Sequence, residues 1–93
     1  MGRVSIRFFQ PIANHFGYPE PGGFKLEPDI DVSAPLRNVI ASVSVRGLNI
    51  LNKLQSEKIV VMVAINGLMD HSGLDAKVKD GDKVSIFPRI GGG

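Results

Sequence analysis

The sequence ends with a strand pattern, a proline and three glycines. This order predicts where the folded domain ends and an irregular C-terminal segment begins. Val84 and Ile86 alternate with polar residues, which predicts a half-buried strand. Pro88 has no backbone N–H, so we expect the hydrogen-bonded ladder to end at this residue. The residues before Pro88 therefore belong to a sheet, and no regular structure is expected from Pro88 onward.

The expected division is one domain of residues 1–87 and a flexible, glycine-rich tail of residues 88–93. Glycine has no Cβ, so such a tail can enter a channel that is too narrow for side chains. The terminal carboxylate, on Gly93, is a group that can be activated chemically. A frayed chain end is the alternative explanation for three glycines, and the rest of the sequence decides between the two.

The composition predicts a single globular domain and argues against nucleic-acid binding, membrane insertion and a metal site. A chain of 93 residues, 43% apolar and 22% charged, is expected to form one globular domain. The net charge is +2 and the basic residues are scattered among nine acids, so no basic patch for nucleic acid is predicted. Without a signal peptide or an apolar run near about 18 residues, we expect a cytoplasmic protein that does not enter a membrane. There is no cysteine, and His15 and His71 lack metal-ligand spacing, so neither a metal nor a bound cofactor is expected.

Alternation and turn signals predict the strands. Residues 3–9 form the first strand, with Val4, Ile6 and Phe8 on one face. A loop follows over 10–23, with one helical turn closed by Gly17. A second strand, which we assign to residues 24–32 up to Val32, is interrupted by Pro28 and should lie at an edge or contain a bulge. A third strand covers 59–65, and Asn66-Gly67 predicts a hairpin turn into a short return strand.

One amphipathic helix is expected between the second and third strands. Ser33 is the predicted N-cap, and Gly47 is the predicted stop. The apolar stripe has helical spacing and consists of Leu36, Val39, Ile40 and Val43. Residues 48–54 form either a further short helix or a packed loop. The predicted fold is therefore α+β, a β-grasp in which a mixed sheet of four to five strands packs on one main helix, with the first and last strands parallel at its centre.

Three stretches give the chain a specific resemblance. They are Phe8-Phe9, the hairpin sequence at 63–67, and the run from Asp80 to Pro88 followed by the glycines. With these residues the chain resembles the ubiquitin-like sulfur carriers of the MoaD/ThiS family, closest to the small subunit of molybdopterin synthase. Arg89, the third glycine and the long segments 10–23 and 47–57 depart from that family's usual pattern.

The resemblance implies a protein substrate and not an enzyme. An adenylyltransferase similar to ubiquitin-activating enzymes would consume ATP to adenylate Gly93, and a sulfur donor would convert it to a thiocarboxylate. The large subunit of molybdopterin synthase would then receive the sulfur for molybdenum cofactor biosynthesis. The residues expected to be recognised in the tail are Pro88, Arg89, Ile90, Gly91 and Gly92.

Strand parity predicts where the partners dock. Since successive strand residues face opposite sides, four apolar side chains should lie on the sheet face that the helix does not cover: Phe9, Met62, Ala64 and Phe87. A contiguous exposed apolar surface of this kind is typical of a partner site. The alternative is that the loop 10–23 folds over these residues.

Three other functions stay open at this point. The chain can be a ubiquitin-like modifier that is joined to lysines through Gly93, either alone or in addition to sulfur transfer. It can also be the sulfur carrier of thiazole formation, although those chains are usually shorter and lack the Phe-Pro pair. A β-grasp adaptor with an incidental tail is the remaining class.

Overall fold

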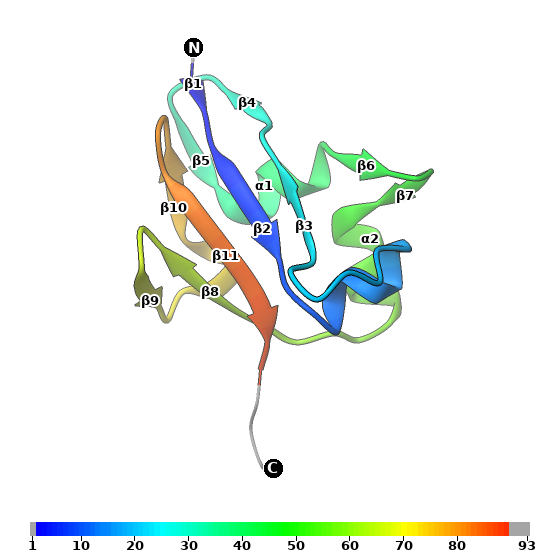
Figure 1. Cartoon of the computed structure of the whole chain (residues 1–93). Coiled ribbons are helices and arrows are strands. Elements are labelled where there is room, and N and C mark those ends of the chain that lie inside the picture. The colour runs from blue at the N-terminus through cyan, green and yellow to red at the C-terminus, as the bar shows by residue number, and fades with distance from the viewer. Residues whose placement is uncertain (1, 90–93) are drawn as a thin grey trace.

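In the computed structural model, which describes residues 2–89, a five-stranded mixed sheet forms the centre of the molecule. Its strands lie in the order β3 (Phe24–Leu26), β2 (Ser5–Phe8), β11 (Lys83–Pro88), β8 (Val61–Ile65) and β9 (Leu68–Asp70). β2 and β11 pair in parallel, and the other neighbours are antiparallel. Figure 1 shows both helices on one side of this sheet. The predicted β-grasp arrangement, with parallel first and last strands at the centre, is confirmed.

The side of the sheet that faces the helices, here called the inner face, carries the core. Ile6 and Phe8 of β2, Val84 and Ile86 of β11, and Val63 of β8 are all buried. Ile86 lies opposite Phe8 in one neighbouring strand and Val63 in the other, so these side chains form one layer across the sheet. Because the side chains of a strand alternate between faces, the residues between them lie on the opposite, outer face.

Two short helices, and not one main helix, cover the inner face. α1 spans Leu36–Ala41 and α2 spans Ile50–Ser56, with a hairpin of β6 (Ser44–Val45) and β7 (Leu48–Asn49) between them. The predicted stop at Gly47 is wrong, because α1 ends at Ala41 and Gly47, with φ +79°, forms the hairpin turn together with Arg46 at φ +50°. The predicted alternative of a second short helix is confirmed. Asn49 caps α2 by accepting a hydrogen bond from the Asn52 N–H at 3.0 Å.

The start of α1 also differs from the prediction. Ser33–Pro35 forms β5, which pairs with β10 (Lys77–Lys79) in a separate two-stranded sheet. Ser33 is therefore not the N-cap; Pro35 occupies that position, and the first helical N–H, of Leu36, donates to the Ala76 carbonyl at 2.8 Å. The Ala76 carbonyl thus accepts the hydrogen bond from the start of the helix that the side chain of a serine N-cap would otherwise accept.

Pro28 interrupts the second predicted strand as expected. β3 ends at Leu26, and β4 (Asp29–Ile30) pairs with β1 (Gly2–Arg3) in a small sheet of its own. The Pro28 carbonyl accepts a hydrogen bond from the Val4 N–H at 3.1 Å. Val32, which the pattern assigns to this strand, lies beyond it and is 80% exposed, so that assignment is wrong.

The segment 10–23 packs beside the helices (Figure 1). It contains η1 (Ile12–Phe16), a 3-10 helix that ends at Gly17 in the left-handed conformation, as predicted. Phe16 contacts Phe24 edge-on, with ring centroids 5.7 Å apart. Three side chains of η1 are buried in the core: Ile12, Ala13 and Phe16.

The chain returns to the sheet centre through a tight hairpin and a short connection. Asn66-Gly67 forms the β8–β9 turn with φ values of +53° and +85°, which confirms the predicted hairpin. η2 (Gly73–Asp75) and β10 then lead to β11, and Val78 of β10 is buried in the core. Within residues 2–89 no helix is long and apolar enough to span a bilayer.

Candidate docking face and the exit of the C-terminal segment

β11 carries the chain out of the body at the end of the sheet. Pro88 is the last residue of β11 and lies opposite Val61, so the expectation that regular structure stops before Pro88 is wrong by one residue. The Arg89 N–H extends this pairing by donating to the Val60 carbonyl at 3.1 Å. The predicted tail residues Ile90, Gly91, Gly92 and Gly93 lie outside the described part of the chain.

Proline fits at position 88 because of where its backbone faces. Backbone groups of successive strand residues point to alternate neighbours, and Arg89 points to β8. The backbone nitrogen of Pro88 therefore faces the β2 side. β2 ends at Phe8, and the next residue, Phe9, donates its N–H to the Ile86 carbonyl. No ladder bond is lost at Pro88.

The outer face carries an apolar surface next to this exit. All four predicted docking residues are half buried there: Phe9, Met62, Ala64 and Phe87. Phe87 lies opposite Met62 in the register, and its ring meets the Phe9 ring edge-on at 6.5 Å between centroids. Sequence reasoning missed Met69, 45% exposed and opposite Ala64, and left Val60, 59% exposed, out of the site. We call these six residues the outer-face patch.

The loop 10–23 does not take the position over the patch that the alternative requires. Its buried apolar side chains, described above for η1, belong to the core cluster. The loop meets the outer face at Arg7, whose guanidinium Nη1 donates to the Gly22 carbonyl at 2.9 Å. Lys25 of β3 lies opposite Arg7. The outer face is thus basic toward β3 and apolar toward β8 and the chain exit.

A buried carboxylate fixes the strand that leads to the exit. Asp82, which follows the Asp80-Gly81 turn, is 5% exposed. Its Oδ1 accepts from Asn66 Nδ2 at 3.0 Å and its Oδ2 from the Lys79 N–H at 2.9 Å. Asn66 Oδ1 accepts in turn from the Lys83 N–H at 2.9 Å. Burial acts to raise the pKa of Asp82, but these hydrogen bonds and the Lys79 charge outweigh it, so the pKa lies below its ordinary value. The β8–β9 turn and the start of β11 are thereby held together.

The remaining polar candidates lie at the surface or beside turns. His15 is exposed, with Nδ1 3.9 Å from Glu57 Oε1, and His71 is exposed as well. Asp80 Oδ1 accepts from the Arg3 N–H at 2.9 Å beside the turn. Over residues 2–89, no group of three metal-ligating side chains comes together. Gly23 serves close backbone packing, since a Cβ there would lie 1.7 Å from the Phe8 carbonyl oxygen.

Fold and site together define a ubiquitin-like β-grasp protein, in which a central strand delivers the C-terminal segment beside an apolar sheet face. The profile of the ThiS family matches residues 25–93, which is more than half of the sequence. The chain belongs to the ThiS family. No match was found among curated protein sequences.

Solved structures with the same fold cover nearly all of the chain. SAMP1 from Haloferax volcanii superposes with a TM-score of 0.64 at 18% identity, covering 99% of this chain and 100% of that one. A Pyrococcus furiosus protein assigned as molybdopterin converting factor, subunit 1, gives 0.63 at 21% identity, with 97% and 100% coverage. A chain in the complex of subunits 1 and 2 of molybdopterin-converting factor from Helicobacter pylori gives 0.55 at 24% identity, with 98% and 99% coverage. At these identities the similarity establishes the fold.

Proposed function

We propose that this chain is a sulfur carrier whose terminal Gly93 is adenylated and then converted to a thiocarboxylate. A carboxylate is a poor electrophile until one of its oxygens becomes part of a good leaving group. An adenylyltransferase similar to ubiquitin-activating enzymes supplies that leaving group by forming the acyl-adenylate from ATP. A sulfur donor then displaces AMP. In this role the chain is a protein substrate, binds no cofactor itself and performs no catalysis.

The observation that carries this proposal is the route of the chain at the end of β11. Arg89 is still paired to Val60, and the glycines begin two residues later, at Gly91. The body is therefore complete where the terminal segment starts. Three consecutive glycines present no Cβ to a surrounding channel, so the carboxylate can approach ATP and a sulfur donor closely. Membership of the ThiS family supports the same reading.

The partner that we propose is the large subunit of molybdopterin synthase. The similarity to a chain in the Helicobacter pylori complex of subunits 1 and 2 supports a larger partner of this kind. The outer-face patch would dock on it, because its exposed apolar side chains lie beside the exit of the chain. Residues 88–92 would then be recognised inside the partner, with Gly93 at its active site.

A second function is favoured by the similarity to SAMP1, a modifier protein by its name in a second solved structure. In that case the activated Gly93 carboxyl would form an isopeptide bond with a lysine Nζ of another protein. Both functions use the same activation step, and they differ in the nucleophile that attacks the adenylate. The apolar patch and the glycine segment serve either function.

The two functions can be separated by intact mass spectrometry of protein purified from its native cell. A sulfur carrier should show a mass increase equal to the exchange of one oxygen for one sulfur, whereas a modifier should appear in conjugates of higher mass. Deletion of Gly92 and Gly93 should abolish ATP-dependent activation and leave the melting temperature nearly unchanged. A truncated chain that still accepts sulfur or forms conjugates would contradict both functions and favour an adaptor.

A further inference from the structure

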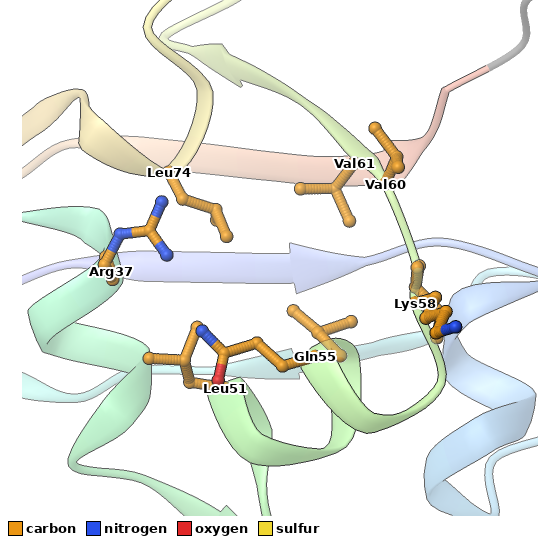
Figure 2. A pocket seen from close by; sticks show the side chains of 9 residues that line it. Arg37, Leu51, Gln55, Lys58, Val60, Val61 and Leu74 are labelled. Carbon is orange, nitrogen blue, oxygen red and sulfur yellow. The ribbon is translucent and has the colours of Figure 1, made fainter.

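An apolar groove of about 390 Å³ lies open on the inner side of the molecule, beside the start of β8. Figure 2 shows Val61 pointing toward Leu74 and Leu51, whereas Val60 points away. Leu51, Val61 and Leu74 are each only half buried, as is Ile59 at the end of the groove nearest the chain exit. The groove therefore leaves apolar surface that one further side chain can cover. Val60 borders both the groove and the outer-face patch, but the other five residues of the patch do not line the groove.

The register of β11 directs the next residue of the chain to this groove. Pro88 is paired with Val61, and Arg89 donates to Val60. If the antiparallel pairing continued by one more step, Ile90 would lie opposite Ile59. Even-numbered residues of β11, such as Ile86, face the inner side, so in this pairing Ile90 would face the groove and not the outer-face patch.

The backbone at Ile59 is compatible with this pairing. Arg89 and Val60 form a hydrogen-bonded pair, so the next pair, Ile90 with Ile59, would be of the non-hydrogen-bonded type. Side chains approach most closely in such pairs. The pair also requires no ladder bond from the Ile59 N–H, which already donates to the Leu54 carbonyl at 2.9 Å.

We propose that the chain's own terminal segment, residues 90–93, is anchored by the Ile90 side chain in this groove. Ile90 is the last residue with a side chain beyond a hydrogen, and it stands directly before the glycines. In the free chain, with Ile90 docked, only Gly91–Gly93 would project, and three extended residues span about 10 Å. An unanchored segment of four residues would span about 14 Å. The groove would thus set both the reach and the starting point of the carboxylate in the free chain, and Ile90 would leave the groove when a partner takes up residues 88–92. The effect of this anchor on activation rests on the proposed function, but the docking itself does not.

The test is methyl-labelled NMR on the full-length chain. Nuclear Overhauser contacts are expected between the Ile90 methyls and the methyls of Leu51, Val61 and Leu74. Ile90→Gly should abolish them and shift the groove methyls to the positions seen when residues 90–93 are deleted. Ile90→Leu should retain contacts with the groove. Val32→Ala, a change in an exposed apolar side chain outside the groove, is the matched control and should leave the groove signals unchanged.

Two results would overturn the anchor. One is the absence of contacts in a folded chain, with groove signals that Ile90→Gly and the deletion leave unchanged. The other is contacts that arise only between chains in mixtures of labelled and unlabelled protein, which would assign the groove to the tail of a second copy. Failure of adenylation with the contacts intact would refute the proposed function and not the anchor, so the two failures are distinguishable.

Discussion

Asp82 links the start of β11 to two neighbouring elements. Its carboxylate accepts hydrogen bonds from the hairpin turn and from β10, and Asn66 completes the link to β11. Because its pKa is lowered on folding, the native state binds a proton less readily than the unfolded chain. The resulting stabilisation is present above the ordinary aspartate pKa of about 3.9 and is lost as the pH falls through the lower, folded value.

Asp82→Asn is therefore expected to lower the free energy of unfolding at neutral pH by about 2 kcal/mol, because an amide cannot accept both charge-assisted hydrogen bonds. Urea unfolding at about pH 7 and pH 3 should also show a smaller acid-induced loss of stability than in the parent chain. Exposed Asp31, changed to asparagine, is the control and should alter neither value by more than about 0.5 kcal/mol. A variant that is as stable and as acid-sensitive as the parent would refute this role.

Gly23 is fixed by a close backbone contact and not by chain flexibility alone. Its φ is +72°, and an added Cβ would lie 1.7 Å from the Phe8 carbonyl oxygen. Gly23→Ala is expected to cost about 3 kcal/mol or more of folding stability, since backbone must move to admit the methyl group. Gly67→Ala, at φ +85° with open space around it, should cost only about 1 kcal/mol. Equal losses of stability for the two variants, in thermal or urea unfolding, would show that the positive φ, and not the contact with the Phe8 carbonyl, determines the cost at both sites.

At the level of elements, prediction from sequence succeeded where local pattern and long-range pairing agree. The alternation of apolar and polar residues in β2 and β11, together with the Asn66-Gly67 turn, is sufficient to predict the central strands of the sheet. Gly47 is ambiguous, because glycine at positive φ ends helices and also closes hairpins. The sequence around Ser33 is typical of a helix N-cap. In the structure Ser33 is instead in a strand that pairs with β10, more than 40 positions away, where Lys79 lies opposite Ser33. No local signal reports such a partner.

The candidate site could also be predicted only where a local pattern was sufficient. Strand parity was enough to place the four predicted residues of the outer-face patch on one side. Met69 was missed because the face of a return strand depends on its register with β8, which places it opposite Ala64. The burial of Asp82 depends on Asn66, 16 positions away, so a turn pattern cannot reveal it. Ile90–Gly93 lie outside the described residues, and their recognition stays a prediction.

The outer-face patch gives a prediction for the sheet as an element. Phe87→Asp should weaken binding to the activating enzyme or the large subunit about 30-fold or more, as expected when a central aromatic contact is replaced by a charge. Folding stability should fall by only about 1 kcal/mol, since Phe87 is half buried outside the core cluster. Calorimetric titration with each purified partner, alongside urea unfolding, measures both effects.

Val32→Asp is the matched control for Phe87→Asp. Val32 is an apolar side chain, 80% exposed, that lies outside the patch. It should accept the same charge without a change in partner affinity or stability. Loss of folding in Phe87→Asp, with affinity preserved in the fraction that stays folded, would assign Phe87 to the core and defeat the docking role.

In the molecule as a whole, the core and the terminal glycines are separable. Every buried apolar side chain of the described core cluster lies between Val4 and Ile86. Changes at Gly91–Gly93 are therefore expected to leave folding stability nearly unchanged, since no core contact involves a glycine side chain. Function and stability can then be measured independently on variants of the last residues.

Gly92→Val uses this separation to ask whether the terminal segment is enclosed by its activating enzyme. Valine adds a branched side chain and confines the backbone to negative φ, so it should be excluded from a channel that accepts only glycine. ATP–pyrophosphate exchange should fall to background, whereas Gly92→Ala, with a single methyl group, should retain an intermediate rate. Both variants should melt within about 1 °C of the parent chain, because the core is untouched. If Gly92→Val is activated as fast as the parent, the segment is not enclosed, and recognition must rest on the folded body and its outer-face patch.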